Sequence, residues 1–121
     1  MADNCCLPSG NTMILTCSGA SNVGQLSNQA AVELTQEGFG KFFCLAGIGA
    51  HLNAFVQSAK DVPEMVVIDG CSVGCAKGVV EQAAVPLKKY LVVTDLGIEK
   101  NKVFKLKEEE VKKVKAAVKS L

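Results

Sequence analysis

The segment Met65–Cys75 has the sequence MVVIDGCSVGC. Its first four residues are apolar and mostly β-branched, which is typical of a strand that is buried on both faces of a sheet. The polar residues and glycines that follow favour a tight turn, which contains Cys71 and ends at Cys75. The segment therefore predicts a buried strand with thiol groups just beyond its carboxyl end.

Three further apolar runs are similar to this one, and helical patterns separate them. Apolar residues recur at helical spacing from Val23 to Leu34 and from Leu52 to Ala59, and a weaker pattern begins at Cys75. Alternation of strands and helices implies a parallel sheet with helices on both faces. We expect a single-domain, three-layer α/β/α fold of the flavodoxin or Rossmann-like kind, with a mostly parallel four-stranded sheet in the order 2-1-3-4. The expected strands are Met13–Cys17, Lys41–Ala46, Met65–Ile68 and Tyr90–Thr94.

The chain length of 121 residues predicts one domain over residues 1–121. We expect residues 1–10, which carry Cys5 and Cys6, to form a mobile N-terminal tail or a lid over the site. Residues 105–121 predict a C-terminal amphipathic helix, because valines recur there at spacings of three and four and glutamates precede lysines.

The composition excludes several classes of partner. The formal net charge is +1, and the chain has no Trp and one Tyr, so neither charge nor stacking gives a reason to expect nucleic acid. The apolar runs are shorter than the roughly 20 residues of a membrane-spanning helix, so we expect no membrane partner. The first ten residues lack the apolar core of a signal peptide. These features predict a cytoplasmic protein.

Six cysteines in a cytoplasmic chain favour metal binding or thiol chemistry over disulfide bonds, because cytoplasmic thiols stay reduced. Four of them lie at the ends of expected strands, which meet at the carboxyl edge of a parallel sheet, where open α/β folds bind ligands. Neighbouring strands lie about 4.8 Å apart and zinc–sulfur bonds measure about 2.3 Å, so sulfurs on adjacent strand ends can reach one metal ion. The pattern predicts a thiolate metal site, most simply for zinc. Its expected ligands are Cys17, Cys44, Cys71 and Cys75.

Cys71 and Cys75 have the spacing C-x3-C, whereas zinc knuckles and thioredoxin-like redox pairs typically have C-x2-C. If a helix begins near Cys71, both thiols share one of its faces. The same thiolates would also suit thiol redox chemistry, sulfur transfer through a persulfide, soft-metal handling or an iron–sulfur cluster. A small molecule or a redox protein would then be the partner, and whether the chain is an enzyme stays open. The candidate catalytic residues are Cys71, Cys75, Asp69 and His51.

Glycines are concentrated in the expected turns at the same edge. They would form an anion-binding nest beside the thiols, or they would serve turns that require a positive φ. None of them matches the dinucleotide-binding or P-loop pattern, and we expect a positive φ for most. The candidate nest consists of Gly19, Ser21, Gly47, Gly49 and Gly74.

Three motifs occur in order along the chain: TCSGASNVG over Thr16–Gly24, CLAGIG over Cys44–Gly49, and Asp-Gly-Cys over Asp69–Cys71, followed by Cys75-Ala76. Together they resemble the DGC-domain family, which is named for its central Asp-Gly-Cys motif, over roughly residues 13–97. The resemblance implies a small prokaryotic zinc-binding domain with four chelating cysteines, and it assigns no reaction. The matching positions are Cys17, Cys44, Cys71 and Cys75, whereas Cys5 and Cys6 do not map onto the family pattern.

Overall fold

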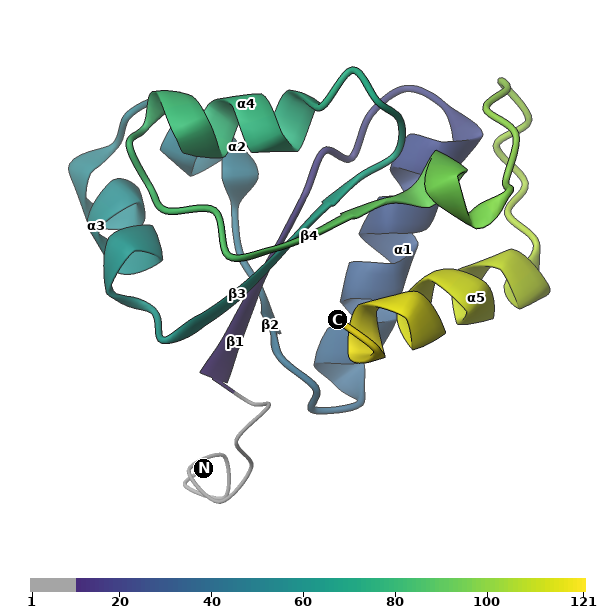
Figure 1. Cartoon of the computed structure of the whole chain (residues 1–121), viewed down its shortest axis with the longest axis horizontal. Helices are drawn as coiled ribbons and strands as arrows, with labels where there is room; N and C mark the ends of the chain where they lie inside the picture. Colours follow the sequence, from purple (N-terminus) through teal and green to yellow (C-terminus); the bar gives the residue numbers. More distant parts are fainter. Residues whose placement is uncertain (1–10) are drawn as a thin grey trace.

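The sheet consists of four strands: β1 (Thr12–Thr16), β2 (Lys41–Phe42), β3 (Glu64–Asp69) and β4 (Lys89–Val92). All four are parallel and their order is β2-β1-β3-β4, as predicted (Figure 1). In the register of the sheet, Met13 of β1 lies between Lys41 of β2 and Met65 of β3. The computed structural model describes residues 11–121, so the expected tail with Cys5 and Cys6 lies outside the described residues.

Helices cover both faces of the sheet (Figure 1). On one face lie α1 (Asn22–Gln36) and α5 (Glu108–Lys119), and on the other lie α2 (Leu45–Gly49), α3 (Asn53–Asp61) and α4 (Cys75–Gln82). A short 3-10 helix, η3 (Val93–Leu96), follows β4. This arrangement confirms the expected three-layer α/β/α fold. No helix between residues 11 and 121 has the length and apolar character needed to cross a bilayer.

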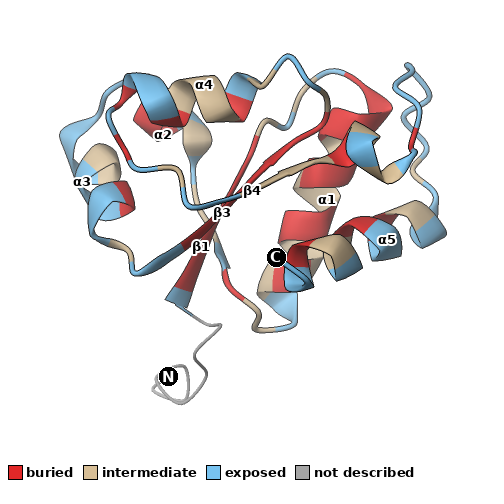
Figure 2. Cartoon of the chain, viewed as in Figure 1, coloured by how far each residue is buried: buried red, intermediate tan, exposed pale blue. Residues whose placement is uncertain are grey.

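Alternate residues of the two central strands contribute to two separate cores. Ile14, Val66 and Ile68 pack with α1 and α5, whereas Leu15 and Val67 pack with α2, α3 and α4. All five side chains are at most 1% exposed, and β1 and β3 are accordingly red over most of their length in Figure 2. Because successive side chains of a strand point to opposite faces, a strand covered on both faces is apolar at nearly every position. This explains why the two central strands are continuous apolar runs in the sequence.

The start of α1 is fixed by Ser21, whose hydroxyl accepts the N–H of Gly24 at 3.1 Å. Such a cap satisfies one of the N–H groups that a helix leaves free in its first turn. The predicted apolar stripe from Val23 to Leu34 is buried against the sheet. The α1 and α5 helices are further joined by Lys115, which forms ion pairs with Glu33 and Glu37.

The two edge strands are shorter than predicted. β2 ends at Phe42 after pairing with two residues of β1, and Cys44 then serves as the N-cap residue of α2. β4 ends at Val92, and the chain turns into η3, where the N–H of Thr94 donates to the carbonyl of Gly70 at 3.1 Å. Edge strands are paired on one side alone and are often short.

Candidate functional site

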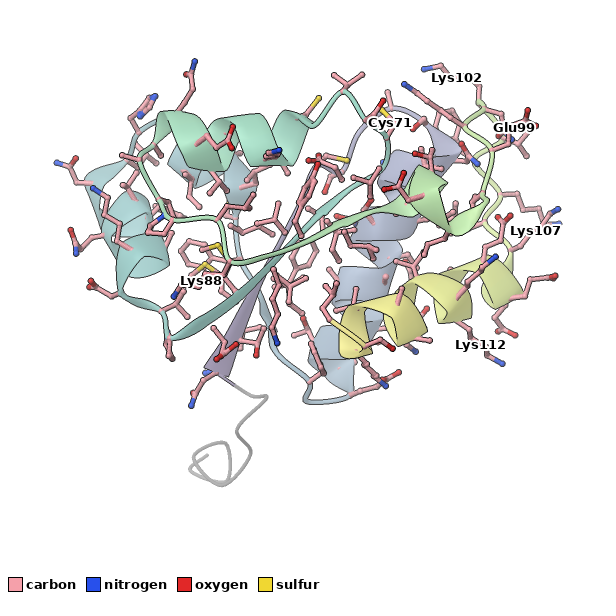
Figure 3. The ribbon with its side chains drawn as sticks, in the orientation of Figure 1. Cys71, Lys88, Glu99, Lys102, Lys107 and Lys112 are labelled. Atoms are coloured by element: carbon pink, nitrogen blue, oxygen red, sulfur yellow. The ribbon has the colours of Figure 1, made fainter. Side chains whose placement is uncertain are left out.

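The four cysteines of the expected site lie at the carboxyl edge of the sheet. Cys17 follows β1 directly, and Cys71 lies two residues beyond β3. Cys44 precedes α2, and Cys75 is the first residue of α4. Because the strands are parallel, these positions meet at one edge, where Figure 3 labels Cys71. Cys17 and Cys71 are half-buried, whereas Cys44 and Cys75 are exposed.

The four cysteines line two hollows at this edge of the sheet. The first, the apolar hollow, has a volume of about 570 Å³ and is lined by Cys17 and Cys44 together with apolar side chains such as Phe43 and Val79. The second, the lysine hollow, has a volume of about 260 Å³. Cys17 lines both hollows and therefore lies between Cys44 and the other two cysteines. The lysine hollow is lined by Cys17, Gly19, Ala20, Ser21, Gly24, Asp69, Gly70, Cys71, Val73, Gly74, Cys75, Lys100 and Lys102.

Hydrogen-bond donors lie against two of the sulfurs. The N–H of Gly70 donates to Cys17 Sγ at 3.4 Å, and the ammonium group of Lys100 lies 3.5 Å from Cys71 Sγ. A backbone N–H and an ammonium group each place positive charge beside sulfur, which is the environment of nucleophilic and metal-binding cysteines. Cys17 and Cys71 are therefore the two cysteines of this edge with a hydrogen-bond donor beside the sulfur.

Among residues 11–121, no group of three or more Cys, His, Asp or Glu side chains is arranged to hold a metal ion. The four sulfurs share an edge without gathering around one point. The donor set nevertheless suits zinc in kind, because four thiolates are an ordinary ligand set for that ion. Cys44 and Cys75 are exposed, so their side chains can rotate about the Cα–Cβ bond without displacing packed neighbours.

The side chain of Asp69 is buried and hydrogen-bonded to α4 and Tyr90. Only 1% of the residue is exposed, and its side-chain oxygens accept the N–H groups of Ala76 at 2.7 Å and Lys77 at 3.0 Å and the hydroxyl of Tyr90 at 2.7 Å. The carboxylate therefore caps the first turn of α4 from the neighbouring strand. Burial, followed by the hydrogen bond to Asp69, raises the pKa of Tyr90 above its ordinary value.

The α4 helix begins at Cys75, and not near Cys71. The residues between them form a turn in which the N–H of Gly74 donates to the carbonyl of Cys71 at 3.2 Å. Gly74 itself has a left-handed backbone with φ 72°, which an L-residue adopts at a cost. The two cysteines therefore do not share a helix face, and the turn instead places both of them on the wall of the lysine hollow.

His51 lies apart from the cysteines. It occupies the turn between α2 and α3, is exposed, has a positive φ of 58° and lines neither hollow. His51 follows the short helix α2, which was not predicted from the sequence, and this helix determines where His51 lies.

The glycines at this edge are explained mostly by close approach. Of the glycines considered above, Gly74 is the one with a positive φ, so the expectation of positive φ for most of them is wrong. A Cβ on Gly24 would lie 2.6 Å from the carbonyl oxygen of Gly19, and a Cβ on Gly70 would lie 2.7 Å from the nitrogen of Gly24. The backbones of Gly19, Gly24 and Gly70 are in contact, and a side chain at Gly24 or Gly70 would force them apart.

The members of the candidate anion nest do not form one cluster. Gly19, Ser21 and Gly74 line the lysine hollow, whereas Gly49 lines the apolar hollow. Gly47 is buried, and its Cβ position is taken by the ring of Phe55. The structure thus places three of the five nest residues in the lysine hollow.

Lys100 and Lys102 were not identified from the sequence. They belong to the segment between η3 and α5, and Figure 3 shows Lys102 and Cys71 at the same corner of the molecule. Lys102 donates from Nζ to the carbonyl of Ala20, and Lys100 lies against Cys71 as described. Their neighbours are polar and surface-like, so no local pattern distinguishes them from other exposed lysines; the long-range fold alone brings them to the cysteines.

The comparisons with known proteins place the chain in a family. The model of the DGC domain matches residues 13–118. The protein described as "Anaerobic and virulence modulator AnvM" of Pseudomonas aeruginosa is 31% identical over 88 residues, which are 73% of this chain and 67% of that protein. No solved structure matches the chain. The family match spans nearly the whole described chain and includes all four cysteines of the edge, so this chain belongs to the DGC domain family.

Proposed function

We propose that the protein binds a thiophilic metal ion, zinc foremost, through Cys17, Cys44, Cys71 and Cys75. The observation that supports this proposal best is the location of four cysteines from three separate segments at one edge of the sheet, with Cys17 on the wall shared by both hollows. Once bound by four thiolates, zinc would have a structural or regulatory role; with an open position it would supply Lewis-acid chemistry.

The surroundings of the sulfurs favour a metal that prefers anionic thiolates. Cys17 accepts the N–H of Gly70, and this backbone donor would persist when the sulfur also binds a metal ion. Cys44 and Cys75 would supply the remaining sulfurs by rotating inward from exposed positions. Reduced thiols are required throughout, which fits the cytoplasmic location expected from the sequence.

The experiment that tests the proposal is elemental analysis of the untagged full chain, purified under reducing conditions without chelator. We expect about one zinc ion per chain, because four thiolates complete one tetrahedral site. Cys17→Ser and Cys71→Ser should each abolish stoichiometric binding, whereas Cys5→Ser and Cys6→Ser should leave it unchanged. If the Cys5 and Cys6 variants lose the metal and the Cys71 variant keeps it, the proposed ligand set is wrong. Visible absorbance together with bound iron would instead favour an iron–sulfur cluster.

Thiol chemistry at Cys71 is the second candidate, and the contact with Lys100 favours it. An ammonium group beside a half-buried thiol stabilises the attacking thiolate in redox exchange or persulfide transfer with a small molecule or a redox protein. In metal-free protein, Cys71 should then be alkylated faster than exposed Cys44, and Lys100→Met should slow this reaction. Peptide mass spectrometry of the alkylated chain separates the two sites. Faster labelling of Cys44 would exclude this candidate.

A further inference from the structure

The wall of the lysine hollow carries two lysines and one carboxylate besides its three cysteines. Lys100 and Lys102 line it, and Asp69 is the one acidic residue among the described residues that line it. Both oxygens of Asp69 already accept hydrogen bonds from α4 and Tyr90, as described above. Glu99 lies next to Lys100 in sequence but lines a different hollow, together with Asn22 and Glu110. The two ammonium groups thus have no free carboxylate beside them within the hollow.

The segment that carries the two lysines is held in place by Asn22, the first residue of α1. The side-chain amide of Asn22 donates to the carbonyl of Glu99 at 2.8 Å and accepts the N–H of Asn101 at 2.6 Å. The N–H of Asn22 also donates to the carbonyl of Asn101 at 3.0 Å. Asn101 lies between the two lysines in sequence, and Asn22 is buried. The lysines therefore stand on a fixed backbone, which reduces the entropy lost when they bind a ligand.

The walls of the hollow leave room for a ligand group. Several of the other residues that line the hollow are glycines or small residues, and one of them, Gly74, has a left-handed backbone. The volume of the hollow, about 260 Å³, is several times the volume of about 30 Å³ that one water molecule occupies in the liquid. A tetrahedral oxyanion with a small substituent fits such a volume.

We propose that the lysine hollow binds a doubly charged tetrahedral oxyanion, namely a phosphate or sulfate group that is free or carried by a small molecule. Lys100 and Lys102 each supply an ammonium donor, and two positive charges match a dianion better than a carboxylate. Since Lys100 Nζ lies 3.5 Å from Cys71 Sγ, the bound group would lie beside this sulfur. Cys17, Cys71 and Cys75 line the same hollow, but the two lysines and the backbone that carries them would hold the anion, so a variant of one cysteine can separate anion binding from metal binding.

Titration calorimetry of the full reduced chain with inorganic phosphate tests this proposal, with sulfate and acetate as further probes at constant ionic strength. We expect phosphate and sulfate to bind and acetate to bind at least tenfold more weakly. Lys100→Gln and Lys102→Gln should each weaken phosphate binding at least tenfold. Sulfate binding as tight as phosphate binding would indicate a site for the shared tetrahedral dianion, whereas a preference for phosphate would identify a phosphate group as the natural ligand.

Lys88→Gln is the matched control. The Lys88 side chain also donates to backbone carbonyls, those of Val62 and Pro63, but lies far from Cys71 in Figure 3. This variant should bind phosphate as the parent chain does. Equal weakening in Lys88→Gln and Lys102→Gln would show that overall charge alone attracts the anion, and undetectable binding to the parent chain would also overturn the proposal.

Cys71→Ser separates this proposal from the metal site. Phosphate binding should remain within about threefold of the parent chain in this variant even though metal is lost. If Cys71→Ser loses both, the anion site does not exist independently of the metal; if metal is absent from the parent chain but phosphate binds, the metal proposal alone fails.

Discussion

The hydroxyl of Tyr90 and the carboxylate of Asp69 form a hydrogen bond of 2.7 Å that joins β4 to the end of β3. The same carboxylate accepts two N–H groups of α4, from Ala76 and Lys77. One buried side chain thereby joins two strands to the start of α4, whose first residue is Cys75. The carboxylate of the Asp-Gly-Cys motif thus fixes the local structure, and the cysteine of the motif lines the lysine hollow.

Replacing Asp69 by Asn should destabilise the protein by about 3 kcal/mol, because an amide NH₂ would face donors that now meet a charged acceptor. Urea unfolding followed by circular dichroism measures the change. Asp95→Asn, at an exposed position in η3, is the control and should change the free energy of unfolding by less than about 0.5 kcal/mol. Equal stability of the Asp69 variant and the parent chain would contradict the capping role.

Tyr90 should resist ionisation while the chain is folded. Burial and the bond to Asp69 raise its pKa, so the folded state binds a proton that the unfolded state releases near pH 10. The free energy of unfolding should therefore fall as the pH rises above about 10, and it should keep the full contribution of Tyr90 below that pH. The chain has one Tyr and no Trp, so the phenolate absorbance band reports this residue alone.

In Tyr90→Phe, the free energy of unfolding should no longer show the fall above about pH 10 that ionisation of Tyr90 causes. At neutral pH it should be lower than in the parent chain by about 1 kcal/mol, because a hydrogen bond is lost. Appearance of the phenolate band near pH 10 in parent protein that still has its native circular dichroism would refute the assignment.

Gly24→Ala and Gly70→Ala should each destabilise the chain by about 2–3 kcal/mol or more, because the added Cβ meets backbone atoms that cannot rotate away. Gly78→Ala provides the contrast within the same fold. Gly78 lies inside α4 with no atom within 4 Å of its Cβ position, so alanine there should stabilise the helix by up to about 1 kcal/mol. Thermal unfolding should therefore show a lower melting temperature for Gly24→Ala and Gly70→Ala and a higher one for Gly78→Ala. A lower melting temperature for Gly78→Ala would contradict the open space around Gly78.

Asn22→Ala should release the backbone of residues 99–101 and destabilise the chain by about 2 kcal/mol, since it removes a donor and an acceptor from a buried position. Hydrogen–deuterium exchange should show faster exchange over these residues and weaker phosphate binding should accompany it. Asn28→Ala is the control, because the Asn28 side chain accepts a hydrogen bond from exposed Ser18 and does not contact this segment. Unchanged exchange in the Asn22 variant would mean that other contacts hold the lysines.

The fold was largely predictable because its information is local. Continuous apolar runs such as Met65–Ile68 indicate strands covered on both faces, and the stripe from Val23 to Leu34 indicates a helix with one buried face. The edge strands were predicted less well. At Cys44 and Val93 the chain leaves a strand and enters a helix. Whether a strand continues at such a point depends on how many strands pair with it in the sheet, which the local sequence does not indicate.

The sequence by itself determined the order of the strands and helices and the location of four cysteines at one edge, since parallel polarity places every strand end on the same side. Only the tertiary structure decided what surrounds those cysteines. It turned Asp69 toward α4 and Tyr90, placed Gly24 against Gly70, and brought Lys100, 29 residues further along the chain, next to Cys71. These contacts join residues that are distant in sequence, and they form only when several packed elements fix the distance between them, which no local pattern of residue types can specify.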